Sequence, residues 1–127
     1  MATMQVQLVA PDRMVWSGQA EIILARTVDG ELGILPRHEP LLGVLVENPV
    51  RIRRADDDEL VAAVHGGFLS VSAESVDVLA EIVELAAEID VPRARAALER
   101  TKDSTDEEDK AAARRAVARL RAAGEDV

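Results

Sequence analysis

The sequence contains no cysteine and only two aromatic residues, Trp16 and Phe68. The absence of cysteine excludes disulfides, thiolate metal sites and thiol nucleophiles, and it is consistent with a reducing cytosol. No apolar run approaches the roughly 18 to 20 residues that a membrane-spanning helix needs. Residues 1–9 lack the basic start and apolar stretch of a secretory signal, so we expect none.

An excess of acidic residues gives the chain a net charge of −9. Nucleic acid and anionic lipid repel such a chain, and two aromatics provide no stacking platform for single strands. We therefore expect a protein or small-ligand partner and no nucleic acid. Residues 1–86 hold 6 basic and 14 acidic side chains, whereas residues 87–127 hold 9 and 10, which indicates two regions with different roles.

Catalytic motifs are missing from the 127 residues. The two histidines, His38 and His65, fall in different segments, and a structural or interface role is expected for each. The acidic run 56–59 lacks the alternating spacing of a calcium loop and is interpreted as a solvated hairpin tip. No phosphate-binding glycine motif or nucleophile elbow occurs, so we expect no metal site and no enzyme activity.

The first two thirds of the chain consist of short apolar segments separated by turn residues. Residues 4–10 alternate apolar and polar side chains, residues 20–28 are nearly continuously apolar, and residues 14–16 are expected to form a short strand that ends in a turn at Ser17-Gly18. Further strands are expected within 50–53, 59–64, 68–71 and 76–79. Strands at this spacing indicate a β-sandwich or barrel.

The last third predicts two helices. Asp90 is a suitable N-cap with Pro92 in the first turn, and Val91, Ala94, Leu98 and Thr101 share one face. Thr105 with Glu108 predicts a capping box for a second helix, which Gly124 ends. Residues 79–87 also have helical spacing, so pattern alone would begin a helix near Ala80.

The inward faces of the expected hairpin are mainly alanine, with Leu98, Val117 and Leu120 as larger anchors. Each anchor contributes roughly 1.5–3 kcal/mol when fully buried. Helices of this length are marginal in water, and docking them costs chain entropy. A net docking energy of about a few kcal/mol would let a ligand or partner change the hairpin's position.

One segment, DGELGILPRHEPLL at 29–42, packs two glycines and two prolines into what reads as a single long loop. It closely resembles the signature loop of the epsilon subunit of F-type ATP synthases. HGGFLSV at 65–71 followed by VDVLA at 76–80 resembles the family's next strands, and IDVPRA at 89–94 resembles its helix start. The motifs occur in the family's order, and the likeness covers essentially the whole chain.

The resemblance implies an α+β fold: a ten-stranded β-sandwich over 1–86, with strand through about Leu85, followed by an antiparallel two-helix hairpin over 87–127. It implies a non-catalytic rotor subunit of the central stalk, peripheral at the cytoplasmic face of the bacterial plasma membrane. The implied partners are the gamma subunit, the c-ring and the catalytic beta subunits, with membrane contact only through the complex. The implied ring- and gamma-facing residues are Glu31, Gly33, Pro36, His38, Leu41 and Leu42.

In this family the hairpin can extend beside gamma and hinder ATP hydrolysis through basic side chains. The matching residues here are Arg93, Arg95, Arg100, Arg114, Arg115, Arg119 and Arg121, each of which could equally be a solvated helix residue. Some members bind regulatory ATP on the folded hairpin, at positions that match Glu84, Ile89, Asp90, Arg93, Ala94 and Arg100. The chain departs from the family pattern in its shorter hairpin and in the acidic stretch 103–109, so second-helix arginines are not matched to that site.

The sequence is compatible with two other functions. A stand-alone β-sandwich adaptor that regulates another complex would bind partners other than gamma and the c-ring. A small hydrolase would use a site around His38 or His65 and would show turnover by the isolated chain.

Overall fold

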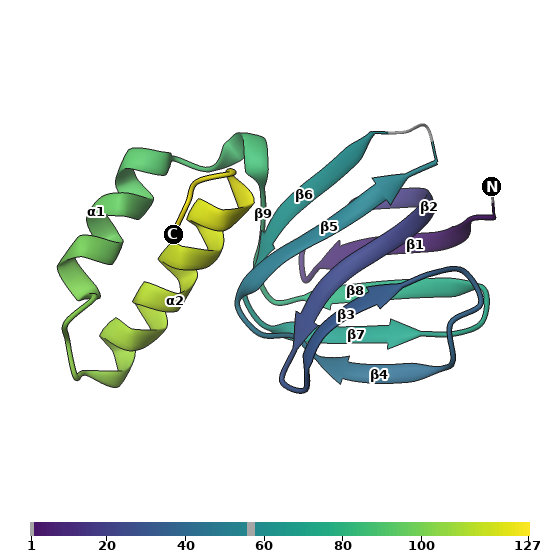
Figure 1. The fold of residues 1–127 in the computed structure, drawn as a ribbon, viewed down its shortest axis with the longest axis horizontal. Helices are drawn as coiled ribbons and strands as arrows, with labels where there is room; N and C mark the ends of the chain where they lie inside the picture. Colours follow the sequence, from purple (N-terminus) through teal and green to yellow (C-terminus); the bar gives the residue numbers. More distant parts are fainter. Residues whose placement is uncertain (1, 56–57) are drawn as a thin grey trace.

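A computed structural model describes residues 2–55 and 58–127 and shows a β-sandwich followed by a two-helix hairpin, which confirms the expected fold class (Figure 1). The described residues form nine strands rather than the ten expected. The strands are β1 (Met4–Ala10), β2 (Arg13–Thr27), β3 (Gly30–Ile34), β4 (Leu41–Val44), β5 (Asn48–Arg54), β6 (Glu59–Val64), β7 (Gly67–Val71), β8 (Ser75–Ala80) and β9 (Val83–Leu85). A 3₁₀ turn η1 (Ala86–Glu88) leads to α1 (Val91–Thr101) and α2 (Glu107–Ala122).

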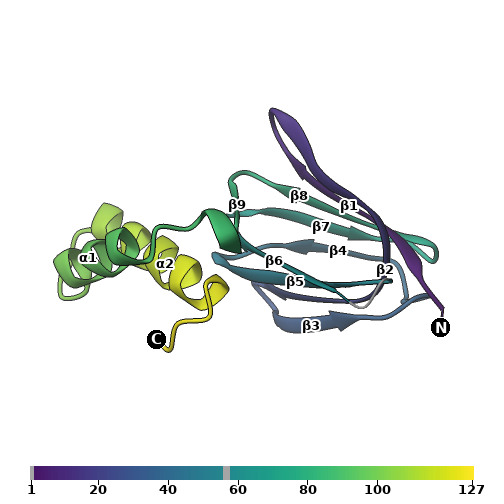
Figure 2. The same cartoon turned by 90° about the horizontal axis from the view of Figure 1, so that it is seen from above.

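The strands form one folded sheet in the order β4-β7-β8-β1-β2-β5-β6-β9, with β3 also paired to β2. Strand β2 belongs to both layers of the sandwich. Its first half pairs with β1, and its second half pairs with β5 and β3. Figure 2 shows the two layers, with β1, β7 and β8 in one and β3, β5 and β6 in the other. Only the β1–β8 pairing is parallel among the ladders of the described residues.

The turn expected at Ser17-Gly18 is wrong, because both residues lie inside strand β2. Ser17 pairs with Gln7 and Gly18 pairs with Val6, so the strand continues without interruption. A Cβ on Gly18 would lie 2.6 Å from the ring of Trp16. The glycine therefore makes room for the indole and does not reverse the chain, which is one reason why the strand count is lower than expected.

The segment 29–42 is also not one long loop. The Asp29-Gly30 turn is present, with Gly30 at φ +119°, but residues 30–34 then pair with β2 and residues 41–44 pair with β7. Only residues 35–40 remain as a connection. His38 donates its backbone N–H to the carbonyl of Leu35 at 3.2 Å, and Arg37 has φ +68°, as in a type II turn that starts at Leu35.

The sandwich core consists of side chains that alternate along each strand. β1 buries every second residue, from Met4 to Ala10, against the inner faces of the other strands. The continuous apolar cluster includes residues from Met4 to Val83 and no residue of the helices. The β-sandwich therefore encloses a core of its own.

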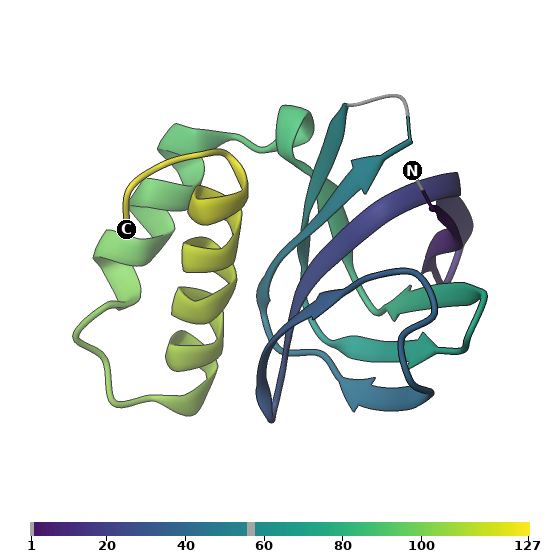
Figure 3. The ribbon, with the colours of Figure 1, turned by 45° about the vertical axis from the view of Figure 1, so that its right-hand side comes forward.

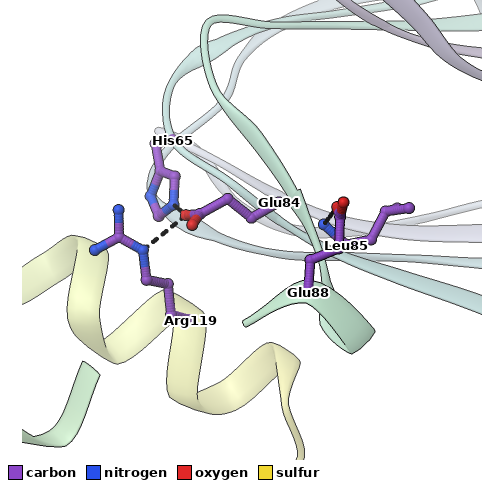
Figure 4. Close-up of polar contacts among 5 residues, drawn as sticks. All are labelled: His65, Glu84, Leu85, Glu88 and Arg119. Carbon is purple, nitrogen blue, oxygen red and sulfur yellow. Dashed lines mark hydrogen bonds and ion pairs between the residues drawn. The ribbon is translucent and has the colours of Figure 1, made fainter. Parts of the chain in front are cut away.

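The ambiguous segment 79–87 is strand and not helix through Leu85, as the family resemblance implied. Val83 pairs with Val64 and Glu84 with Ala63, so β9 extends the β6 edge of the sheet. Glu88 folds back and accepts the backbone N–H of Leu85 at 3.2 Å (Figure 4). The helical spacing of apolar residues here does not produce a helix because the backbone pairs with β6, and Ile82 remains 49% exposed.

The helices begin at aspartate caps. The side chain of Asp90 accepts the backbone N–H of Arg93 at 3.1 Å, as expected. The prediction of a capping box at Thr105 is wrong. Helix α2 is capped by Asp106, whose side chain accepts the backbone N–H of Glu108. Two aspartate caps satisfy otherwise free N–H groups and complement the positive helix N-termini.

The hairpin packs on the outside of the sandwich through α2. Helix α2 lies against β5 and β6, and α1 lies on the far side of α2 (Figure 3). The buried residues of α2 are Ala116, Ala118, Leu120 and Ala122, and α1 buries Ala94 and Thr101. Of the three expected anchors, only Leu120 is fully buried. Neither helix in the described part of the chain is long and apolar enough to cross a bilayer.

Candidate functional site

A cavity of about 560 Å³ lies at the boundary between the sandwich and the hairpin. Its walls come from β9, η1, α1 and α2. Four arginines and three carboxylates line it, together with alanines that leave space between the helices. The lining residues are Glu84, Glu88, Asp90, Arg93, Ala94, Ala96, Ala97, Arg100, Ala112, Arg115 and Arg119.

The carboxylate of Glu84 is the polar centre of this boundary. Its Oε1 accepts a hydrogen bond from Nε2 of His65 at 2.8 Å and one from Nε of Arg119 at 2.7 Å (Figure 4). His65 follows β6, Glu84 lies on β9, and Arg119 lies on α2. One oxygen atom thus joins two parts of the sandwich to the hairpin.

These contacts set the charge state of the group. Burial alone would raise the pKa of Glu84, but the hydrogen bonds from Arg119 and His65 outweigh it and lower the pKa below the usual 4.5. Burial lowers the pKa of His65 below 6.5, and the charge of Arg119 adds to this against the opposing effect of Glu84. At neutral pH Glu84 is therefore an anion and His65 a neutral imidazole.

An ionised carboxylate only accepts hydrogen bonds, so Nε2 is the protonated ring nitrogen of His65 and donates the hydrogen bond to Glu84. The other ring nitrogen, Nδ1, is buried without a hydrogen-bond partner among the described residues. The expected structural or interface role of His65 agrees with this geometry. His38 instead contacts the carbonyl of Glu39 through Nδ1 at 2.8 Å, and in the described residues neither histidine bonds to a serine.

Most of the residues proposed for ATP share the cavity. Five of the six line it, whereas Ile89 is half-buried beside it without lining it. Asp90 also caps α1, so its helix-capping role is present in addition to its place in the wall. Arg115 and Arg119 complete the lining from α2, where their spacing of four residues puts them on one face. That spacing could have assigned them to the site from the sequence.

The seven arginines of the expected basic face are divided in the docked hairpin. Arg93, Arg100 and Arg115 line the cavity and form no ion pair with any described residue. Arg114 pairs with Glu47 at 3.4 Å, Arg119 with Glu84, and Arg95 with Glu125. Arg121 lines a second cavity of about 700 Å³, beside Arg26, Glu31 and Arg51.

The six residues expected to face the ring and gamma are spread over three elements. Glu31 and Gly33 lie on β3, Pro36 and His38 lie in the 35–40 connection, and Leu41 and Leu42 lie on β4. Glu31 and Leu42 are exposed, whereas Leu41 and His38 are half-buried. The structure places Glu31 at the opposite end of β3 from Pro36, so these residues do not form one compact patch.

An exposed apolar row, which sequence reasoning missed, crosses the outer face of the β4-β7-β8 layer. Val44 pairs with Phe68, which pairs with Leu79, and these three side chains are 46%, 50% and 44% exposed. Leu42, two residues from Val44 on the same face, is 71% exposed. Adjacent large apolar side chains left in solvent make this face a candidate interaction surface.

A known protein family matches the β-sandwich part of the chain. The family model for the β-sandwich domain of the ATP synthase delta/epsilon chain matches residues 3–86. This chain belongs to the ATP synthase epsilon chain family. The ATP synthase epsilon chain of Streptomyces griseus is 53% identical over 121 residues, which cover 95% of each chain. That of Corynebacterium efficiens is 53% identical over 123 residues, which cover 96% of this chain and 94% of the relative.

Two solved assemblies contain chains of similar fold. A chain of the Euglena gracilis mitochondrial ATP synthase structure (OSCP/F1/c-ring) matches 98% of this chain and 83% of its own length, with TM-score 0.86 and 24% identity. A chain of the Tetrahymena thermophila mitochondrial ATP synthase central stalk/c-ring matches 98% of both chains with TM-score 0.62 and 19% identity. At these identities the likeness shows the fold alone. The family assignment makes the chain a non-catalytic subunit of the membrane-associated ATP synthase, and it decides against the hydrolase and adaptor alternatives.

Proposed function

We propose that the β-sandwich, residues 1–86, couples c-ring rotation to gamma in the central stalk, and that the hairpin, residues 87–127, brakes ATP hydrolysis. The observation that carries this division is the composition of the core. The apolar cluster of the sandwich contains no helical residue, whereas the hairpin interface is mostly alanine. The sandwich can therefore keep its fold while the hairpin moves.

The exposed row of Val44, Phe68 and Leu79 supports gamma as the partner of the outer sheet face. It spans neighbouring strands and presents an apolar surface to a second protein. The connection 35–40 and the residues at Glu31, Gly33, Leu41 and Leu42 remain the proposed contacts with the ring and gamma. With the ring in the membrane, the chain would be peripheral, at the cytoplasmic face of the bacterial plasma membrane.

Braking would require the hairpin to leave its docked position. Docked, Arg114 and Arg119 pair with Glu47 and Glu84 of the sandwich, so these charges are engaged internally. Extension would release them, together with Arg93, Arg95, Arg100, Arg115 and Arg121, toward acidic segments of the catalytic beta subunits. The brake would thus be a shift in population between two positions of the hairpin.

Deletion of residues 91–127 in the assembled ATP synthase tests the division. The complex should assemble and remain coupled, because the sandwich core is untouched, and ATP hydrolysis should rise. ATPase activity and proton pumping of membrane vesicles measure the two effects. Loss of assembly on deletion would contradict the proposed division of labour.

Regulatory ATP is a further part of this proposal. Arginines 93, 100 and 115 have no ion-pair partner among the described residues and surround a cavity of about 560 Å³, which suits a polyphosphate. Glu84 and Asp90 would accept hydrogen bonds from the adenine or ribose. Calorimetric titration of the full chain with ATP should give saturable binding that Arg93→Gln weakens, and absence of binding by the unmodified chain would remove the nucleotide from the proposal.

A further inference from the structure

One oxygen of Glu84 receives donors from two structural units. Nε2 of His65 reaches it at 2.8 Å from the sandwich, and Nε of Arg119 reaches it at 2.7 Å from the hairpin. The two donors differ in exposure. The side chain of His65 is 3% exposed, whereas those of Glu84 and Arg119 are 31% and 29% exposed. The imidazole is thus the fixed member of the group.

A partly exposed ion pair contributes little when both side chains are free to move, because pairing costs their conformational entropy. A carboxylate that is already held by a buried donor loses less freedom when a second donor arrives. His65 holds Glu84 from the sandwich side, and both partners of this hydrogen bond belong to the sandwich. Arg119 therefore meets a preorganised acceptor.

The second ion pair across the boundary lacks this feature. Arg114 approaches Glu47 at 3.4 Å with its side chain 55% exposed, and no other described side chain binds Glu47. Arg114 and Glu47 have opposite charges, but no second side chain among the described residues holds the carboxylate of Glu47 in position. Of the two ion pairs across the boundary, the pair at Glu84 is therefore the one whose acceptor is already held by a second donor.

We propose that His65 is a positioning residue of the docked hairpin: it fixes the carboxylate of Glu84 so that Arg119 holds α2 on the sandwich without a bound nucleotide. The inference rests on the proposed function in one respect, namely that the hairpin can leave the sandwich. It adds a residue outside the cavity lining to the control of that movement, and it makes docking a property of the chain itself.

Two amide substitutions separate the positioning role from simple burial. The amide nitrogen of glutamine ends near the position of Nε2, so His65→Gln can keep the donor to Glu84. Asparagine ends one carbon short, near the position of Nδ1, so His65→Asn keeps a polar side chain that cannot reach Glu84. His38→Asn, remote from α2, is the matched control. Hydrogen exchange of the full chain without nucleotide is followed by mass spectrometry for α2 and for β1.

His65→Asn should accelerate exchange in α2 by about tenfold, the effect of one hydrogen bond to a charged group. His65→Gln and His38→Asn should stay within about threefold of the unmodified chain, and exchange in β1 should not change in any variant. In an Arg119→Gln background, His65→Asn should add no further acceleration. Equal effects of the two amides, or an unchanged effect of His65→Asn in that background, would overturn the role of His65.

A measurement on the unmodified chain covers the case in which a variant does not fold. The ¹⁵N spectrum should show the proton of His65 on Nε2, with slow exchange with water; a rapidly exchanging Nε2–H would contradict the proposal. A different result would contradict the proposed hairpin movement. If α2 amides exchange only through unfolding of the whole chain, as judged by their dependence on urea, the movement is wrong whatever His65 does.

Discussion

Arg119 on α2 donates its Nε–H to Glu84 on β9 at 2.7 Å and so ties together residues 35 positions apart. Because Glu84 also holds His65, the pair is part of a three-residue group and not an isolated surface contact. The pair joins the two units whose separation the proposed brake requires. Its strength relative to the Arg114–Glu47 pair is therefore the first quantity to measure.

A double-mutant cycle with Glu84→Gln and Arg119→Gln should give a coupling of about 1.5 kcal/mol for opening of the hairpin. The free energy of opening comes from hydrogen exchange of α2 amides in the full chain. The matched cycle, Glu47→Gln with Arg114→Gln, should give less than about 0.5 kcal/mol because that pair is longer and its arginine is more exposed. Equal couplings in the two cycles would show that Glu84 has no special role.

Acidification from pH 7.5 to 5.5 should lower the free energy of unfolding. The pKa of His65 is depressed in the fold below 6.5, so the unfolded chain binds the proton first and stability falls as the pH drops through this range. The groups that face the imidazole are Glu84 from β9 and Arg119 and Arg115 from α2, with Glu81 beside the adjoining Gly66. Glu84, whose pKa is lowered from 4.5, continues the loss below that value.

Urea denaturation at several pH values measures this dependence. His65→Gln cannot titrate and should flatten the profile between pH 7.5 and 5.5, whereas His38→Gln should leave its slope unchanged. A His65→Gln profile as steep as that of the unmodified chain would assign the pH dependence to other groups.

Gly67→Ala should destabilise the sandwich by about 3 kcal/mol or more. Gly67 has φ +122°, and an added Cβ would lie 2.2 Å from the carbonyl oxygen of Leu79. Gly30→Ala is the control, since Gly30 has φ +119° but no heavy atom within 4 Å of such a Cβ. Its cost should be that of the backbone alone, about 1–2 kcal/mol, and thermal unfolding of the two variants measures the difference.

Phe68→Ala should weaken binding to gamma at least tenfold, roughly the loss of one apolar anchor, while changing the stability of the isolated chain by less than about 1 kcal/mol. Phe68 is 50% exposed at the centre of the apolar row, so it contributes little to the core. Ile82→Ala is the matched control, because Ile82 is 49% exposed and lies outside the row. Equal loss of gamma binding in both variants would argue against this face as the docking surface.

Local signals in the sequence predicted most of the elements but not how they join. Alternation predicted β1, and the Asp90 cap predicted the start of α1. The turn at Ser17-Gly18 was wrong because the need for glycine there comes from the Trp16 ring. The prediction of one loop over 29–42 missed β3 and β4, because such short strands are stabilised by pairing with other strands and carry little local signal.

The candidate site shows the same limit. The helix-start motif named Asp90, Arg93 and Ala94, which line the cavity. The contact of His65 with Glu84 and its link to Arg119 could not be predicted from the sequence. These residues meet only after the β6–β9 edge has formed and α2 has packed on it. The group depends on tertiary structure, and no periodicity marks it.

The 15 residues of β2 run through both layers of the sandwich as one continuous strand, which pairs with β1 in its first half and with β5 in its second, with register shifts at Val15 and Glu21. Force applied at one sheet is therefore carried to the other along a covalent backbone and not only across side-chain contacts. In the proposed coupling of the c-ring to gamma, this strand would resist twisting of the sandwich, since the two layers cannot slide past each other unless it bends.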